Sequence, residues 1–175
     1  MLILCLLCVL MTTVVIQAAP RMNVMLYSSM KDSQMAALKE GFDKKYPNIV
    51  FDFYTAGTGK VMTKITTEQQ AGGISADLIW VGDPTNYVEF KKQGLLLSYA
   101  SPEAKTIPAS MKDPDDCYCA ARLVGLGIVY NTIYVKGDDI PKDWDDLLRP
   151  RFKGILTMTD PIFSGTTLWL YIMIF

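Results

Sequence analysis

The sequence contains no histidine among its 175 residues. This absence excludes a Ser-His-Asp triad, a Cys-His pair and a histidine-ligated zinc site. An excess of positive charge is also missing, because 17 basic residues stand against 18 acidic ones and no basic run occurs. Binding to nucleic acid through bulk positive charge is therefore excluded. Disorder is excluded as well, since 50% of the residues are hydrophobic and the net charge is only -1.

Residues 1–20 carry no charged side chain, and residues 2–16 form an apolar run. This run is shorter than the ~20 residues that a membrane-spanning helix needs. Small residues follow it in Gln17-Ala18-Ala19-Pro20, as at a signal-peptidase cleavage site. The pattern predicts a secretory signal peptide and a periplasmic or otherwise extracytoplasmic protein. A membrane anchor stays open as the alternative, because no positively charged side chain precedes the run.

Cysteine is scarce, with four residues in the chain, of which Cys5 and Cys8 lie in the apolar run. Cys117 and Cys119 are one residue apart in a segment that we expect to be a strand, so their side chains would point to opposite faces. This geometry disfavours a disulfide between them and a metal site made of the two thiols. We expect both to be small apolar fillers.

From Arg21 onward, strand-like and helix-like patterns alternate. Strands are predicted over residues 23–27, 49–54 and 77–81. Helices are predicted after each strand: the first begins in a capping-box pattern at Ser29 and Asp32, the second covers residues 60–71, and the third has Asp83 as N-cap and ends at Gly94. Three strand–turn–helix units in a row predict a parallel sheet with right-handed crossovers, an α/β fold.

A proline- and charge-rich surface connection follows over residues 98–116. The pattern then predicts strands over 118–124, 126–131 and 155–158, helical turns over 143–148, and an apolar helix opened by residues 164–167. Because the alternation restarts after the connection, we expect two lobes. Residues 21–124 would form part of lobe 1, and residues 125–175 would begin lobe 2, entered through residues 120–131.

Small polar residues precede the predicted helices at four places, where strands would end. Unpaired amides at helix N-termini, with neighbouring hydroxyls, are suited to an anion, and ligands of open parallel sheets bind at the carboxyl ends of the strands. The candidate ligand-binding residues are Ser28, Ser29, Thr58, Gly59, Asp83, Ser164, Gly165 and Thr166. Helix capping alone is the alternative for each of them, and Asp83 could also contact a cation or a metal.

Tyr130 is a further candidate, because it lies where the chain would pass between the lobes; core packing is its alternative. The segment Gly57-Thr58-Gly59-Lys60 is not a nucleotide phosphate loop, since no glycine stands at the required earlier position. No pair of carboxylates has a spacing that indicates acid–base hydrolysis. No cofactor and no metal ligand set is predicted.

Several of these segments together resemble periplasmic solute-binding proteins of ABC importers, type II fold. The resemblance covers nearly all of residues 23–168. Within this family, the sequence resembles the branch for iron(III), 2-aminoethylphosphonate, phosphosugars and polyamines. The segments that carry it include Val24-Met25-Leu26-Tyr27-Ser28-Ser29, Ala56-Gly57-Thr58-Gly59, Ala76-Asp77-Leu78-Ile79-Trp80, Val129-Tyr130-Asn131-Thr132, Trp144-Asp145-Asp146-Leu147 and Asp160-Pro161 with Ser164-Gly165-Thr166.

The resemblance implies two α/β lobes, joined by hinge strands, that close on a solute and deliver it to a membrane permease. It implies no catalytic activity and no nucleic-acid partner. Family members are much longer, so the resemblance also implies a truncated chain with an incomplete second lobe. A truncated product that binds nothing is the alternative; it would leave Trp169, Leu170 and Tyr171 uncovered. An enzyme on the same fold is a further alternative.

Overall fold

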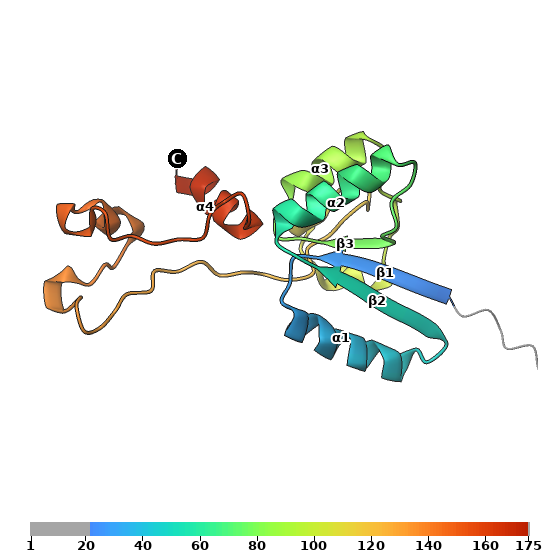
Figure 1. The fold of residues 1–175 in the computed structure, drawn as a ribbon, viewed down its shortest axis with the longest axis horizontal. Helices are drawn as coiled ribbons and strands as arrows, with labels where there is room; N and C mark the ends of the chain where they lie inside the picture. Colours follow the sequence, from blue (N-terminus) through green and yellow to red (C-terminus); the bar gives the residue numbers. More distant parts are fainter. Residues whose placement is uncertain (1–21, 175) are drawn as a thin grey trace, which may run out of the picture.

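A three-stranded parallel sheet lies at the centre of the computed structural model, which describes residues 22–174 (Figure 1). The strands are β1 (Met22–Ser28), β2 (Ile49–Thr55) and β3 (Leu78–Trp80), in the order β2-β1-β3. In the register, Ser28 is level with Thr55 on one side and with Trp80 on the other. The parallel sheet is confirmed, and all three strands end at the same edge.

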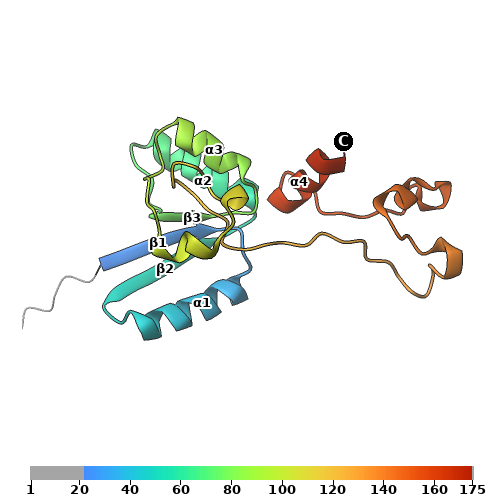
Figure 2. The same cartoon turned by 180° about the vertical axis from the view of Figure 1, so that it is seen from behind.

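Helices cover both faces of the sheet, with α1 (Asp32–Lys45) on one face and α2 (Thr58–Gln70) and α3 (Thr85–Lys92) on the other (Figure 1, Figure 2). Successive side chains of β1 point to opposite faces and so divide the core. Leu26 packs with Met35 of α1, whereas Tyr27 packs with Val61 and Ile65 of α2. This alternation explains why the strand reads as continuously apolar.

The helix starts differ in detail from the predicted caps. The N-cap of α1 is Lys31, with no side-chain cap, so the predicted capping box at Ser29 is wrong. The helix α3 begins at Thr85 and its N-cap is Pro84, not Asp83. Asp83 nevertheless accepts the Thr85 N–H at 3.0 Å, so its carboxylate caps the helix from one position further back.

The buried carboxylate of Asp113 anchors the connection that follows α3. No pattern in the sequence indicates this role. Asp113 is 5% exposed and accepts from Lys91 Nζ at 2.7 and 2.8 Å. Its Oδ2 also accepts the backbone N–H groups of Asp115 and Cys117. Burial alone would raise the pKa of Asp113, but the Lys91 ammonium and these N–H donors lower it.

Beyond residue 121 the chain leaves the sheet as an extended arm that carries short helical turns and then α4 (Gly165–Ile174) (Figure 1). The turn over Trp144–Leu148 is confirmed, capped by Asp143 and Asp146. The strands predicted at 118–124, 126–131 and 155–158 are wrong: in the described residues the only pairing there is a single bridge between Lys112 and Cys119. A strand needs a neighbour for its N–H and C=O groups, and in this part of the chain no other strand lies beside these segments.

Three predictions remain: the signal peptide, the role of the two cysteines and the division into lobes. The signal peptide predicted at residues 1–20 lies outside the described residues. Within residues 22–174, no helix has the length and apolarity needed to cross a membrane.

Cys117 and Cys119 are both free thiols. Cys117 is half-buried, whereas Cys119 is exposed, so the filler role predicted for Cys119 is wrong. The division into lobes at residues 124 and 125 stays a prediction.

The buried face of α1 gives a first testable prediction. Met35 is fully buried between the helix and the sheet, whereas Leu38 on the same helix is 44% exposed. We expect Met35→Ala to lower the free energy of unfolding by about 2–5 kcal/mol, because it leaves a cavity in the core. Leu38→Ala is the matched control and should cost less than about 1 kcal/mol in a denaturant titration. Equal losses for the two variants would contradict the described packing.

A second prediction concerns Glu68 of α2, whose carboxylate accepts from Lys64 at 2.6 Å, from the Tyr27 hydroxyl at 2.7 Å and from the Ser75 N–H at 3.0 Å. The Lys64 ammonium first, then the Ser75 N–H and the Tyr27 hydroxyl, lower the pKa of Glu68 from 4.5 to about 2. Because the folded-state pKa is the lower one, the ionised carboxylate stabilises the fold above pH 4.5, and this contribution is lost as the pH falls towards 2.

We therefore expect Glu68→Gln to destabilise the protein at pH 5 or above, with the difference from wild type shrinking as the pH is lowered. Urea titrations over a pH series measure it. Glu40→Gln is the control, since the Glu40 side chain is 70% exposed in its pair with Lys44 and such pairs contribute little. A wild-type advantage over Glu68→Gln that does not change with pH would refute this account.

Candidate ligand-binding site

The common edge at which β1, β2 and β3 end carries the loops that the sequence singled out. Ser28 is the last residue of β1 and Ser29 follows it, Gly57 leads from β2 into α2, and Gly82 with Asp83 follows β3. In parallel sheets this edge is the usual place of ligand binding, because the amino ends of the following helices meet there.

Ser28 and Ser29 tie two strands together at this edge. The Ser28 hydroxyl is fully buried; it donates to the Trp80 carbonyl at 2.9 Å and accepts the Met30 N–H at 3.1 Å. Ser29 Oγ accepts the Gly82 N–H at 3.1 Å. These contacts join the end of β1 to the end of β3. The Ser28 side chain therefore supports the edge from inside, whereas the half-buried Ser29 lies at its surface.

The start of α4 packs against this edge although it is about a hundred residues away in the chain. A Cβ placed on Gly165 would lie 2.9 Å from Cβ of Asp83 and 3.1 Å from Oγ1 of Thr58. A Cβ on Gly82 would lie 3.2 Å from Oγ1 of Thr166. The structure thus brings Thr58, Asp83, Gly165 and Thr166 together. Ser164 caps α4 beside them, its Oγ accepting the Thr167 N–H at 3.2 Å.

Asp83 is the buried carboxylate of this edge, 4% exposed. Its Oδ1 accepts from the Thr85 hydroxyl at 2.7 Å, from the Thr85 N–H at 3.0 Å and from the indole N–H of Trp169 at 2.9 Å. The sequence analysis did not identify Trp169 as a partner of Asp83, and only its alternative of a truncated product expected Trp169 to be uncovered; the structure has it half-buried and hydrogen-bonded. The available signal was its spacing of four residues from Gly165, which places both on one face of a helix.

Tyr130 is not brought to this edge. It lies in the extended arm, is 36% exposed and makes no hydrogen bond within residues 22–174. Its predicted place between two lobes depended on strands that do not form there. The structure therefore separates Tyr130 from the other eight candidates.

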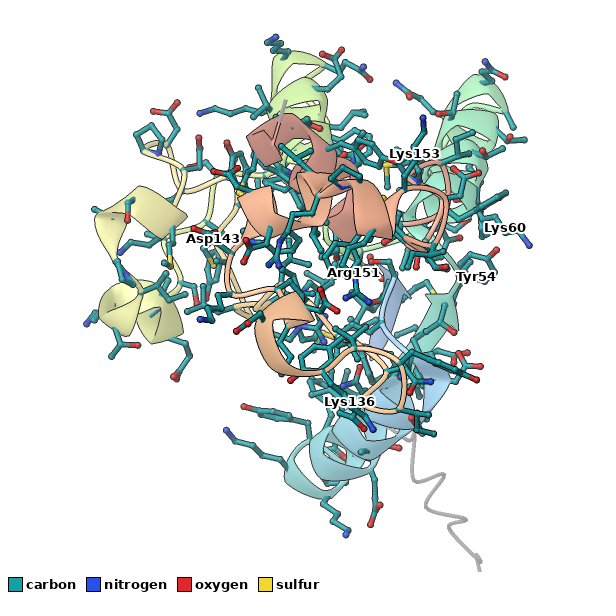
Figure 3. The ribbon with its side chains drawn as sticks, turned by 90° about the vertical axis from the view of Figure 1, so that its left-hand side faces the viewer. Tyr54, Lys60, Lys136, Asp143, Arg151 and Lys153 are labelled. Carbon is teal, nitrogen blue, oxygen red and sulfur yellow. The ribbon has the colours of Figure 1, made fainter. Side chains whose placement is uncertain are left out.

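Exposed cationic side chains surround the arm and the beginning of α2. Lys60 follows Gly59 in the first turn of α2, and Lys136, Arg151 and Lys153 belong to the arm; Figure 3 shows all four from the side of the arm. Arg151 pairs with Asp139. Lys60, Lys136 and Lys153 make no ion pair with any residue that the structure describes. Their unpaired charge attracts anions over roughly a Debye length, about 8–10 Å at ordinary ionic strength.

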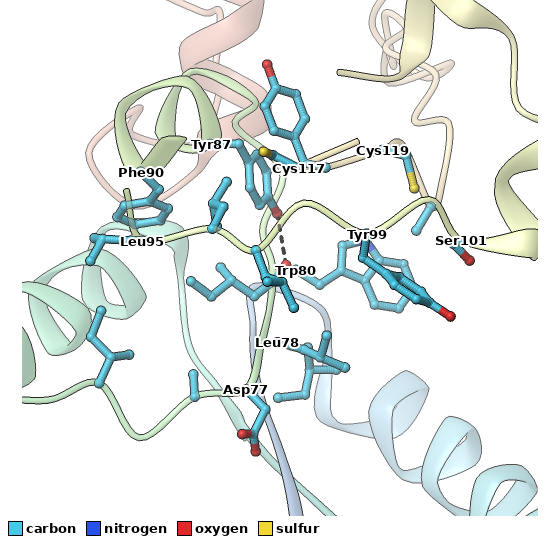
Figure 4. A pocket seen from close by; sticks show the side chains of 18 of the residues that line it. Asp77, Leu78, Trp80, Tyr87, Phe90, Leu95, Tyr99, Ser101, Cys117 and Cys119 are labelled. Carbon is cyan, nitrogen blue, oxygen red and sulfur yellow. Dashed lines mark hydrogen bonds between the residues drawn. The ribbon is translucent and has the colours of Figure 1, made fainter. Parts of the chain in front are cut away.

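An apolar groove of about 1070 Å³ lies elsewhere, along β3 and the connection that follows α3 (Figure 4). Its side chains include Leu78, Trp80, Phe90, Leu95 and Tyr99. The Tyr87 hydroxyl in its wall accepts the Val81 N–H at 2.8 Å, and burial raises the pKa of this hydroxyl. None of the nine candidate residues lines the groove. It opens beside the hydrophobic core, and its lining is mostly apolar.

The described residues contain no group of three or more acidic, cysteine or histidine side chains that could hold a metal ion. The polar groups that do converge are hydroxyls and helix-terminal amides, with the carboxylate of Asp83 as an acceptor. Helix-terminal amides and hydroxyls of this kind are suited to contacts with the oxygen atoms of a ligand.

Comparison with known proteins identifies the family and the fold of the chain. The family model described as "Bacterial extracellular solute-binding protein" matches residues 27–174. No curated protein matches the chain significantly. Among solved structures, the periplasmic binding protein AfuA from Actinobacillus pleuropneumoniae, with exogenous fructose-6-phosphate bound, is similar at 27% identity and a TM-score of 0.62. The match covers 82% of this chain and 46% of AfuA.

A second similar structure is the periplasmic binding protein P5PA, at 28% identity and a TM-score of 0.44, over 51% of this chain and 28% of that one. The chain thus spans less than half the length of either structure. The family match, in contrast, extends over most of the chain, from the end of β1 to the last turn of α4. The chain belongs to the bacterial extracellular solute-binding proteins, with an α/β fold of the periplasmic binding protein type.

Proposed function

We propose that this chain belongs to the receptor of an ABC importer, which captures a small anionic solute outside the cytoplasm and delivers it to a membrane permease. The observation that carries the proposal is the meeting of two helix N-termini at one sheet edge: Gly165 at the start of α4 lies against Thr58 at the start of α2. The positive ends of two helix dipoles then act on the same place.

The donors proposed for the solute are mostly backbone groups. The first N–H groups of a helix have no partner within it, and those of Thr58 and Gly59 in α2 and of Gly165 and Thr166 in α4 stand in this position. Glycine permits a close approach of the ligand at two of these four residues. The hydroxyls of Ser29, Thr58, Ser164 and Thr166 add side-chain donors, and the second oxygen of Asp83 could accept from an amino group of the solute.

The sign of the electrostatic field at the helix N-termini indicates which class of solute the edge would bind. Helix N-termini and the exposed Lys60 favour a phosphate, a phosphonate or the carboxylates of an iron(III) complex over a polyamine. A sugar phosphate is the first solute to test, because AfuA, the similar structure with the higher TM-score, holds fructose-6-phosphate. Localisation to the periplasm follows from the same proposal.

No catalytic step is part of this proposal. Histidine is absent, and the converging groups hold a solute without attacking it. Release to the permease would require only that the contacts at the sheet edge be broken again.

Calorimetric titration tests the site directly. We expect heat of binding with fructose-6-phosphate, a phosphonate or ferric citrate, and no heat with a neutral sugar. Thr58→Val and Thr166→Val should each weaken binding by about tenfold or more, since a hydrogen bond to a charged group contributes about 1.5–3 kcal/mol. Thr66→Val is the control, because Thr66 lies exposed on α2 and its hydroxyl makes no hydrogen bond within the described residues. No heat with any anion would reject the proposal.

The contribution of Lys60 should depend on salt. Lys60→Met is expected to weaken anion binding at 0.1 M salt and to have little effect at 1 M, because the Debye length falls from about 10 Å to about 3 Å. Lys92→Met is the matched control, since Lys92 lies in the last turn of α3. Titrations at the two ionic strengths measure the difference. A salt-independent loss with Lys60→Met would contradict an electrostatic role of Lys60.

A further inference from the structure

Asp83 places a buried negative charge at the sheet edge. The residue is 4% exposed, and none of the ion pairs formed within residues 22–174 includes it. Aspartate is almost never buried to this degree without a cationic partner, because a charge that is removed from water loses its hydration. The charge of Asp83 therefore needs an explanation.

The contacts of the Asp83 side chain use only one of its two oxygens. Oδ1 accepts the hydroxyl and the N–H of Thr85 and the indole N–H of Trp169. In the described part of the chain, no hydrogen bond reaches Oδ2. An asparagine would supply the same acceptor oxygen, and asparagine caps helices as well as aspartate does. Helix capping and the contact with α4 thus account for Oδ1, but not for the charge or for Oδ2.

This carboxylate lies beside the helix ends that are proposed to bind the anion. A Cβ on Gly165 would lie 2.9 Å from Cβ of Asp83 and 3.1 Å from Oγ1 of Thr58, so Asp83 adjoins the starts of both α2 and α4. An anionic group held there would be close to the Asp83 carboxylate, and like charges repel. The helix amides therefore favour the anion while Asp83 opposes it. A solute that also brings a positive group to Oδ2 removes this conflict.

We propose that Asp83 determines the specificity of this edge by selecting solutes that carry an ammonium group next to their anionic group. The inference rests on the proposed function, since the anionic group is the one held by the amides of α2 and α4. The ammonium group donates to Oδ2 of Asp83, and such a charge-assisted hydrogen bond is strong where little water enters. Among anionic solutes, an amino phosphate is then preferred to a phosphate without an amino group.

Two pairs of solutes that differ only in an amino or a hydroxyl group test this selection. They are 2-aminoethyl phosphate with 2-hydroxyethyl phosphate, and glucosamine-6-phosphate with glucose-6-phosphate. In calorimetric titrations of the full chain at pH 7, we expect the amino member of at least one pair to bind about tenfold or more tightly, because a hydrogen bond to a charged group contributes that factor. The preference should persist at 1 M salt, since buried charges are screened less than exposed ones.

Asp83→Asn separates the charge from the other contacts of the side chain. The variant keeps an acceptor oxygen for Thr85 and Trp169, so it should bind the amino member about tenfold more weakly and the hydroxyl member no more weakly than wild type does. Asp52→Asn is the matched control: Asp52 is exposed on β2, and its substitution removes the same charge without changing the preference. Thermal melts establish that both variants fold, and the wild-type comparison decides the matter if Asp83→Asn does not.

The outcomes distinguish this inference from the proposed function. A wild-type chain that binds both members of each pair equally, or the hydroxyl members more tightly, would overturn the selection and leave the proposed function standing. Binding of fructose-6-phosphate but of neither amino phosphate would have the same consequence. Equal weakening of both members in Asp83→Asn would also overturn the selection, because Asp83 would then only support the edge. If no anion binds at all, the proposed function fails, and this inference fails with it.

Discussion

All three parallel strands end at the same edge of the sheet, and the rest of the structure depends on this constraint. The register of β1 with β2 and with β3 puts Ser28, Thr55 and Trp80 in one row. Each loop that follows must therefore begin at the same edge, and each helix must start there. The loops at this edge lie close to residues 162–166. A side chain at Gly57, Gly59 or Gly82 of the edge, or at Gly165 of the packed segment, would collide with the other side or press tightly against it.

The first half of the fold could be predicted from the sequence because its signals are local. Apolar runs over 23–27 and 49–54 with helical patterns between them are sufficient to identify strand–helix units, and parallel topology then brings the strand ends together. The meeting of Thr58 and Asp83 follows from that topology alone. The exact caps did not follow, since the carboxylate of Asp83 reaches Thr85 from one residue before the expected position.

The second half could not be predicted in the same way because its contacts are distant in sequence. Apolar segments at 118–131 resemble strands, yet a strand forms only where a neighbour pairs with it, and residues 22–174 offer none there. The burial of Asp113 depends on Lys91, which is 22 positions away, and the environment of Asp83 depends on Trp169. No local pattern encodes such pairs; only the Gly165–Trp169 spacing hinted at one of them.

The polar groups of the edge divide into those that build it and those that we propose for contact with a solute. Ser28 is buried and bonded on both sides, and Oδ1 of Asp83 already accepts three hydrogen bonds. The helix-terminal amides of α2 and α4 are what remains. Amides recognise charge and the arrangement of oxygen atoms, not the rest of a molecule. On the proposed function, discrimination between one phosphorylated or carboxylated solute and another comes from the side chains around the amides, such as Thr58 and Thr166.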